Sequence, residues 1–300
     1  MKHAISISLG SSKRDKKVEL DLLGQRVCVE RIGTDGDLRR AAQLFREHDG
    51  QVDALGVGGA DLGLLVAGRW YTLDGVKPVV AGVHTTPLVD GTGLKITLER
   101  RAAAFIDTHL RAAVEPRRVL FTLGCDRWGM TVGFIEAHYA YLFGDLGFAL
   151  GLPIPIRSVD TAVRLYRWLL PFIVQLPFAW LYPIGEKQEQ REPRFGEWYR
   201  WATVIAGDCH YIKRHLPDDL GGKVICTNTT TPGDVELFRA AGAQALVTTT
   251  PMFDGRSFGT NALEAALVAA KGKGRTLTFE ELEELIDELR LGPTLQRLNS

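Results

Sequence analysis

The 300-residue chain lacks several features that would place it in a common class of protein. Its formal net charge is zero, so it offers no basic footprint for nucleic acid and no acidic tail. The four cysteines lie far apart with no CxxC pair, which predicts neither a zinc site nor a disulfide framework. HExxH, Walker-lysine and GxSxG motifs are also absent, which disfavours zinc proteases, P-loop proteins and serine hydrolases. We therefore expect no bound metal, no nucleic-acid partner and a reducing, cytoplasmic environment.

A long uninterrupted apolar run is missing too. Residues 168–184 (WLLPFIVQLPFAWLYPI) hold no charge, but three prolines interrupt them. A membrane-spanning helix needs about twenty apolar residues, and proline at this density breaks a helix in water or in lipid. We expect no membrane span here but a buried or inter-domain segment, with a homodimer or apolar-ligand surface as the alternative.

What the chain does have is an alternation of apolar runs and amphipathic helical patterns. From Pro116 onward the apolar runs are at 119–123, 140–143, 203–206, 223–227 and 245–249. Helical patterns follow most of them, at 130–139, 234–241 and 261–270. Continuous apolar strands that alternate with helices predict a parallel sheet covered on both faces.

The first third of the chain shows shorter β-type runs and two helical patterns, at 37–48 and 94–114. We therefore predict an α/β fold in which a smaller α/β domain and a Rossmann-like parallel-sheet domain enclose a cleft. The predicted units are a substrate-side domain (1–113), a nucleotide-binding domain (114–276) with an insertion at 145–200, and a C-terminal helix within 277–300.

The most informative segment is VLFTLGCDRWGM, residues 119–130. An apolar strand stops at Gly124, passes a short polar loop and restarts at Gly129 as a helix, which is the arrangement that holds a pyrophosphate on backbone N–H groups. The spacing is Gly-x4-Gly rather than G-x-G-x-x-G. Asp145 follows Gly124 by 21 residues, where an acid accepts the ribose hydroxyls of a dinucleotide. The segment predicts a site for NAD or NADP; a tight βα turn with a turn aspartate is the alternative.

Polar residues also end the other predicted strands, and ligands of open parallel sheets lie beyond these ends. The expected cofactor-binding residues are Gly124, Asp126, Arg127, Gly129, Asp145, Asp208, Asn228 and Thr229.

Proton transfer to a hydroxyl needs an acid–base group beside the cofactor. Lys95 with Asp90, in the loop before the helical pattern 94–114, is the predicted catalytic pair, because the carboxylate would orient the lysine. The alternative is a solvated lysine in a helix-capping loop. The hydroxyls of Ser6, Ser8 and Ser11 suit polyol binding, and Asn261 either fixes the last loop against the cleft or caps a helix.

A second set of residues leads to other functions. Cys209 and His210 are adjacent, which would suit a thiolate pair in a thiol-dependent acyl or aldehyde reductase. A non-catalytic nucleotide-sensing protein that dimerises through residues 168–184 is the third possibility.

Five phrases resemble the divergent bacterial and archaeal sequences labelled quinate 5-dehydrogenase, within the quinate/shikimate dehydrogenase group. They are SLGSSKRD (8–15), VDGTGLK (89–95), GDLGFALGLPIPIRS (144–158), AGDCHYIKR (206–214) and TTTPMFDGRSFGTN (248–261). The resemblance implies an NAD(P)-dependent oxidoreductase that interconverts an alcohol and a ketone on a hydroxylated carbocycle such as quinate or shikimate. It departs from shikimate dehydrogenases in lacking their GxGGxx turn. Their Asn-Val-Thr-x-Pro-x-Lys motif is matched only by Thr86-Pro87 with Lys95 eight residues later, which makes Thr86 a substrate-binding candidate.

Overall fold

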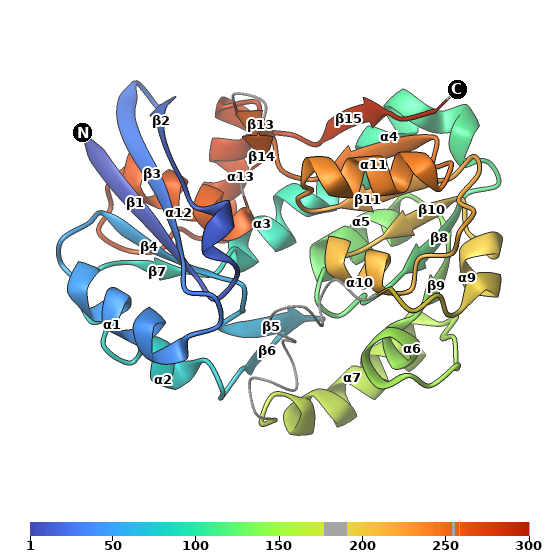
Figure 1. Ribbon diagram of the computed structural model, residues 1–300, viewed down its shortest axis with the longest axis horizontal. Coiled ribbons are helices and arrows are strands. Elements are labelled where there is room, and N and C mark those ends of the chain that lie inside the picture. The colour runs from blue at the N-terminus through green and yellow to red at the C-terminus, as the bar shows by residue number, and fades with distance from the viewer. Residues whose placement is uncertain (177–190, 254–255, 258, 300) are drawn as a thin grey trace.

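The computed structural model describes residues 1–176, 191–253, 256–257 and 259–299, and these form two α/β halves that lie side by side (Figure 1). Each half is built on one mainly parallel sheet, so the predicted mixed α/β fold with two domains is confirmed. Among the helices described, none has the length and apolar character needed to cross a membrane.

The first sheet has the strand order β2-β3-β1-β4-β7. Its four parallel strands are β1 (Lys2–Ser8), β3 (Gln25–Gly33), β4 (Ala54–Gly58) and β7 (Leu88–Val89), and β2 (Lys16–Leu22) runs antiparallel to β3 at the edge. Successive residues of β1 enter different cores, because side chains alternate across a strand. Ile5 and Ile7 pack with Phe45 of α1 (Leu38–His48), whereas Ala4 packs with the apolar residues of α12 (Thr260–Lys271) and α13 (Phe279–Glu288).

The second sheet has the order β15-β12-β11-β10-β8-β9. Its strands are β8 (Arg118–Phe121), β9 (Ala140–Phe143), β10 (Val204–Ala206), β11 (Val224–Thr227), β12 (Ala245–Thr248) and the antiparallel β15 (Thr294–Arg297). Its covering helices include α4 (Ala102–Leu110), α5 (Trp128–Glu136), α9 (Gly196–Trp201), α10 (Cys209–Arg214) and α11 (Pro232–Ala240). Val119 and Phe121 face one core and Leu120 faces the other, so the strands are apolar on both sides, as a doubly covered sheet requires.

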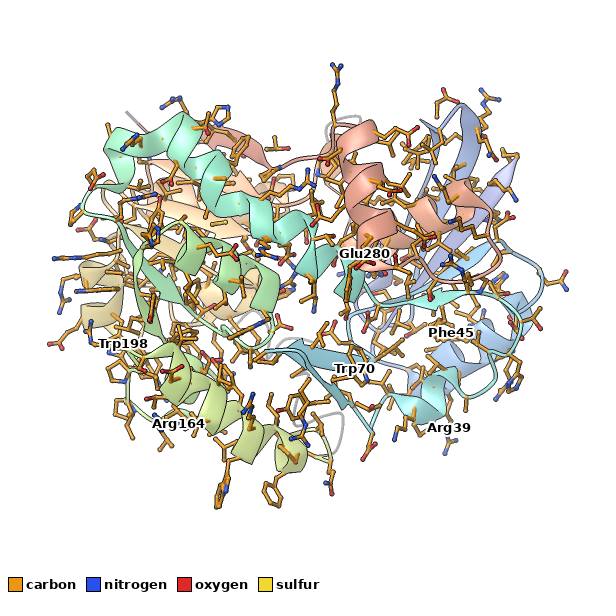
Figure 2. The ribbon with its side chains drawn as sticks, turned by 180° about the vertical axis from the view of Figure 1, so that it is seen from behind. Arg39, Phe45, Trp70, Arg164, Trp198 and Glu280 are labelled. Atoms are coloured by element: carbon orange, nitrogen blue, oxygen red, sulfur yellow. The ribbon has the colours of Figure 1, made fainter. Side chains whose placement is uncertain are left out.

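The remaining elements are short or connect the two halves. Between β9 and β10 lie α6 (Asp145–Leu150) and α7 (Val159–Ile173), within the predicted insertion. The hairpin β5 (Gly63–Val66) with β6 (Arg69–Thr72) projects between the halves (Figures 1 and 2). The others are η1 (Ser12–Arg14), α2 (Lys77–Val80), α3 (Thr92–Ile96), η2 (Leu98–Arg101), η3 (Arg111–Val114), β13 (Met252–Phe253) and β14 (Arg256–Ser257).

The chain passes between the two sheets three times. The first passage runs from β7 through α3, η2 and α4 to β8, the second joins β12 to α12, and the third joins α13 to β15. Helix α12, which we expected in the second domain, instead covers the first sheet. Helix α12 packs closely on β4: a Cβ at Gly56 of β4 would lie 2.9 Å from the carbonyl oxygen of Asn261 in α12.

The apolar segment 168–184 differs from our expectation where the structure describes it. Trp168 and Phe172 lie on α7 with 75% and 67% of their surface exposed, although Leu170 and Val174 are buried. The prediction of a buried segment is therefore wrong for the outer face of α7. Residues 177–184 of this segment lie outside the described residues.

Candidate functional site

Each sheet has a point where the strand order reverses, and the two points are joined by one set of buried charged side chains. In the first sheet the reversal lies between β1 and β4, and in the second between β8 and β10. Loops at such a reversal diverge beyond the carboxyl ends of the strands and leave room there for a ligand. Asp61 follows β4, Asp126 and Arg127 follow β8, and Asp208 follows β10.

Lys95 of α3 connects the loops of the two sheets. Its ammonium Nζ lies 2.8 Å from Oδ1 of Asp61 and 3.2 Å from Oδ1 of Asp126. These side chains are almost completely buried, so the two ion pairs are screened little by solvent.

Arg127 makes the second half of this network. Its guanidinium donates to Oε1 of Glu99 at 2.6 Å, to Oδ2 of Asp208 at 2.7 Å and to Oδ2 of Asp126 at 3.1 Å. Glu99 lies on η2 and is fully buried, and its Oε2 atom has no hydrogen-bond partner among the described residues. We call Asp61, Lys95, Glu99, Asp126, Arg127 and Asp208 the inter-sheet network.

Burial and neighbouring charge divide the four carboxyl groups of the network into two kinds. Burial raises the pKa of Asp61 to about 7, against the opposing charge of Lys95, and burial also raises the pKa of Glu99. The pKa values of Asp126 and Asp208 are lowered, because the positive charges of Lys95 and Arg127 outweigh the effect of burial. The carboxylates of Asp126 and Asp208 therefore balance the two cations, and Asp61 can take up a proton near neutral pH.

Electrostatics also shows that the loops of the two sheets face each other. His210 on α10 is exposed, yet the surrounding protein lowers its pKa by desolvation. The charge of Arg14, in the loop after β1, acts on the same imidazole and lowers its pKa further. Arg14, the last residue of η1 in the first half, therefore lies near α10 of the second half.

Asp145 does not take the role expected of a ribose-binding acid. Its two carboxylate oxygens accept hydrogen bonds from the backbone N–H groups of Gly124 and Cys125, each at 3.1 Å. The donors expected to hold a pyrophosphate are thereby occupied, and so is the acid expected to hold the ribose. These residues do not fit a dinucleotide in the expected pose. Binding of NAD or NADP therefore stays a prediction from the sequence.

The glycines of this loop serve close packing. A Cβ at Gly124 would lie 2.7 Å from the ring of Phe143, and one at Gly129 would collide with the backbone of Lys95 and Ile96. Gly133, one turn further along α5, faces the backbone of Arg100 in the same way. Helix α5 therefore packs directly on α3 and η2, which fixes Lys95 and Glu99 beside Arg127.

The predicted catalytic pair is not brought together. The carboxylate of Asp90 accepts from the backbone N–H groups of Leu62 at 2.7 Å and Thr92 at 2.9 Å, so it orders the loop before α3. Lys95 pairs with Asp61 and Asp126 instead. The charges of Asp126 and Asp61 hold its pKa above the usual value in spite of burial, which leaves it a firmly protonated group.

The predicted substrate-binding residues are dispersed. Ser6 accepts from Nδ2 of Asn261 at 2.6 Å and ties β1 to α12, whereas Ser11 caps η1. Ser8 accepts from Arg31 at 2.9 Å, at the carboxyl end of β1. Thr86 precedes β7 at the opposite end of the sheet, where its hydroxyl accepts from the N–H of Gly50 at 2.7 Å.

Of the residues expected after β11, Asn228 joins the inter-sheet network. Its Nδ2 donates to Oδ2 of Asp208 at 2.8 Å, and its Oδ1 accepts from the backbone N–H of Cys209 at 3.3 Å. Thr229 is half-buried beyond it. The structure thus assembles Lys95, Asp126, Arg127, Asp208 and Asn228 from the prediction.

Two members of the network, Asp61 and Glu99, were missed. Asp61 ends the glycine-rich turn GVGGAD (56–61), and its place after a buried strand was a usable signal. Glu99 lies in a helical pattern beside two arginines, which is typical of a solvated surface, so the sequence held no signal for it.

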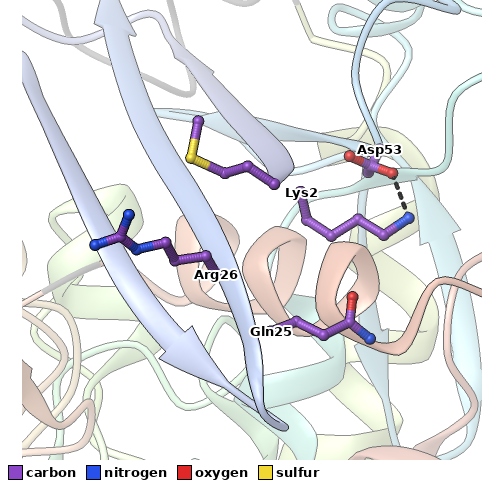
Figure 3. Close-up of a pocket in the computed structure, with 5 residues that line it drawn as sticks. Lys2, Gln25, Arg26 and Asp53 are labelled. Atoms are coloured by element: carbon purple, nitrogen blue, oxygen red, sulfur yellow. Dashed lines mark hydrogen bonds and ion pairs between the residues drawn. The ribbon is translucent and has the colours of Figure 1, made fainter.

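A small cavity adjoins the network. It is lined by Lys95 and Asp126 together with Trp128, Ile96 and the β5 residues Gly63, Leu64 and Leu65, and its volume is only about 10 Å³. A larger pocket lies at the amino ends of β1 and β3, around Lys2, Gln25, Arg26 and Asp53 (Figure 3). This pocket lies at the amino ends of the strands, whereas the inter-sheet network lies beyond their carboxyl ends. The Lys2–Asp53 ion pair in the pocket is partly exposed.

The cysteines offer no reactive thiol. All four are free and buried. Burial raises the pKa of Cys209 well above its usual value, so the thiolate needed by a thiol-dependent reductase does not form near neutral pH. Among the described residues, no three His, Cys, Asp or Glu side chains converge as they would around a metal ion.

Comparison with solved structures gives only distant likenesses. An NAD-dependent malic enzyme from Thermotoga maritima is 13% identical over 100% of this chain and 80% of its own, with a TM-score of 0.41. A sugar-binding protein of a Bacillus halodurans ABC transporter is 14% identical over 83% and 81%, with a TM-score of 0.36. A Caulobacter myo-inositol-binding protein is 12% identical over 98% and 93%, with a TM-score of 0.34. A search of curated proteins found no match.

The expectation of an NAD(P)-dependent dehydrogenase is wrong. Within the chain itself, Asp145 occupies the pyrophosphate donors and Lys95 is held as a cation away from Asp90. The alternatives fail as well: Cys209 is a buried thiol, and the nucleotide-sensing dimer has no support.

Family models cover nearly the whole chain in two parts. One, described as a domain of unknown function and designated DUF8753, matches residues 3–90, which include the five strands of the first sheet. The other, likewise a domain of unknown function, matches residues 93–298, which include α3, the second sheet and α12. Since the second match spans more than half of the sequence, the chain belongs to the DUF8754 family.

Proposed function

We propose that this protein binds a small, neutral, polyhydroxylated solute between the carboxyl edges of its two sheets and does not transform it. The observation that carries the proposal is the inter-sheet network, in which both strand-order reversals contribute to one buried set of donors and acceptors. Ligands of parallel α/β sheets bind at such reversals, and here two of them are joined through Lys95 and Arg127.

Charge favours a neutral ligand. Lys95 and Arg127 are balanced by Asp126 and Asp208, while burial brings the pKa of Asp61 to about 7 and raises that of Glu99. A strongly charged solute would upset this balance in a buried place, where an uncompensated charge is costly. Vicinal hydroxyl groups both donate and accept, so they can bridge carboxylates, guanidinium and the amide of Asn228.

The cavity beside the network has the mixed lining of a small-molecule site. Trp128, Ile96 and Leu64 form apolar walls, and Lys95 and Asp126 supply the polar groups. A cavity of about 10 Å³ holds no more than one water molecule. The proposal therefore requires that the β5–β6 hairpin move away from α3 and α5 to admit a solute.

A thermal-shift screen of the full chain tests this function. The panel contains pentoses, hexoses, inositols and sugar acids, with NAD and NADP in the same plate. A solute at 100 times its Kd stabilises the fold by about 2.7 kcal/mol, which raises the melting temperature by several degrees. We expect such a rise with at least one neutral polyol; a flat response across the panel overturns the proposal.

We further propose that the protein works in a reducing compartment such as the cytoplasm, because its four cysteines are free thiols. Mass spectrometry after alkylation in denaturant, from freshly lysed cells, tests this. Four labelled thiols are expected, whereas a disulfide-linked pair contradicts it.

A further inference from the structure

The outer face of α7 carries a stripe of residues that the solute site does not use. Arg164, Trp168 and Phe172 are spaced by four residues and therefore project from one side of the helix, with Arg167 beside them. The opposite side holds the helix to the second half of the molecule through Ala162, Tyr166 and Leu170, all of which are buried. Figures 1 and 2 place α7 at the periphery of the molecule, and Arg164 is labelled there in Figure 2.

The two aromatic rings of this stripe are unusually exposed. Trp168 is 75% and Phe172 67% exposed, whereas the other exposed aromatic residues described, Trp70 and Phe279, are 44% and 40% exposed. The two rings lie 6.5 Å apart, so they form one apolar surface rather than two separate contacts. Leu150, Leu152 and Ile154, in the segment that leads towards α7, are also about half exposed.

The charged residues of α7 beside the rings have one sign; Asp74, whose backbone N–H donates to the carbonyl oxygen of Val174, is paired with Lys77. Between residues 161 and 176 the only charged residues are Arg164 and Arg167, and both are exposed. No ion pair of either arginine with an acid is found among the described residues; Arg164 donates only to the backbone oxygen of Asp160. Asp160, the one acid of α7, lies two turns before Trp168, which is about 12 Å along the helix.

We propose that α7 docks on an anionic lipid surface, with Trp168 and Phe172 in the headgroup region and Arg164 and Arg167 paired with lipid phosphates or carboxylates. A helix with aromatic residues on one side and flanking arginines is the pattern of an interfacial, non-spanning helix. Tryptophan suits this depth because its ring is apolar and its N–H is polar.

A second copy of the chain is a poorer occupant. An isologous interface would place the stripe against itself, so Arg164 and Arg167 would meet the same arginines, and the stripe holds no acid to pair with them. Two aromatic side chains also bury a few hundred Å² at most, below the roughly 800 Å² per partner of a stable interface. This docking does not depend on the proposed solute site, which lies between the sheets.

Vesicle flotation of the full chain tests the docking, with phosphatidylcholine vesicles compared with vesicles that also contain phosphatidylserine. We expect the protein to float with the anionic vesicles, and raised salt to weaken this binding because the arginine contacts are screened. Trp168→Ser with Phe172→Ser is expected to reduce binding by at least about 100-fold, since both rings lose their transfer into the interface. Arg164→Gln and Arg167→Gln are each expected to reduce it about fivefold.

Phe279→Ser is the matched control, because it removes an exposed ring from α13 and leaves α7 unchanged. It should bind vesicles like the wild type, and the melting temperature of each variant reports whether it is folded. Failure of the folded wild type to float, or equal binding by the Trp168/Phe172 variant, overturns the proposal. A dimer by light scattering that the same variant abolishes, without vesicle binding, would also overturn it and identify a second copy as the partner.

Discussion

Arg127→Met removes the cation at the centre of the inter-sheet network and gives the sharpest test of its energetics. The Arg127 side chain is 6% exposed and contacts three carboxylates, one of which, on Glu99, is fully buried. Removing one partner of a buried ion pair leaves an uncompensated charge and costs about 3–5 kcal/mol of unfolding free energy. We expect a loss in this range by urea denaturation at neutral pH.

Arg100→Met is the matched control, because it removes an arginine from an ion pair with Glu136 in which both side chains are about half exposed. Exposed pairs contribute about 0–1 kcal/mol. Adding Glu99→Gln to Arg127→Met should recover about 2 kcal/mol, because the stranded buried charge is then gone. Equal losses from Arg127→Met and Arg100→Met, or no recovery in the double variant, would refute the reasoning.

Three further predictions concern the surroundings of the network. Burial raises the pKa of Glu264 from 4.5 to about 8, so the folded state keeps a proton that the unfolded chain releases, and the unfolding free energy should fall by up to about 5 kcal/mol as pH rises from about 4.5 to 8. Denaturation across this range should show a steeper slope in the wild type than in Glu264→Gln, in which Asp61 still contributes a slope of the same sign. Equal slopes in the two proteins would contradict the raised pKa of Glu264. Gly129→Ala should destabilise the fold by about 1–3 kcal/mol, because its Cβ collides with the Lys95 carbonyl, whereas Gly292→Ala, in open space, should be neutral by the same assay. A thiol reagent should label the native protein slowly and all four cysteines quickly in denaturant, and rapid native labelling of Cys209 would contradict its burial.

The sequence predicted the second sheet well because its strands are buried on both faces. The runs at 119–123, 140–143, 203–206, 223–227 and 245–249 each correspond to a strand, because a parallel sheet covered on both faces buries both sides of its strands. The edge strands of the two sheets were harder to predict from the sequence. β2 reads KKVELDL, with alternating charges, and β15 is too polar to stand out, so both were missed. One of the shorter β-type runs of the first third, residues 79–83, contains part of α2 instead of a strand; the first turn of this helix begins at Lys77-Pro78.

The candidate site was predicted in part, for a reason that lies in the topology. Asp126, Arg127, Asp208 and Asn228 follow strands of one sheet, and the carboxyl ends of parallel strands share an edge. Their partner Asp61 follows a strand of the other sheet, and only the placement of the halves shows that it meets Lys95; Glu99 lies on a connecting helix and gave no signal at all. The ribose-binding role predicted for Asp145 was not found, because an acid 21 residues after a glycine turn can equally well accept hydrogen bonds from the N–H groups of that turn.

Isothermal titration of the full chain with the neutral polyol that gives the largest thermal shift tests the central claim most directly. The inter-sheet site predicts one solute per chain. It also predicts a Kd at least about tenfold weaker in Asp126→Asn, which loses a charged hydrogen-bond acceptor, and an unchanged Kd in the exposed control Glu136→Gln. Binding of equal strength in folded Asp126→Asn, or no binding of any neutral polyol to the wild type, would contradict the account.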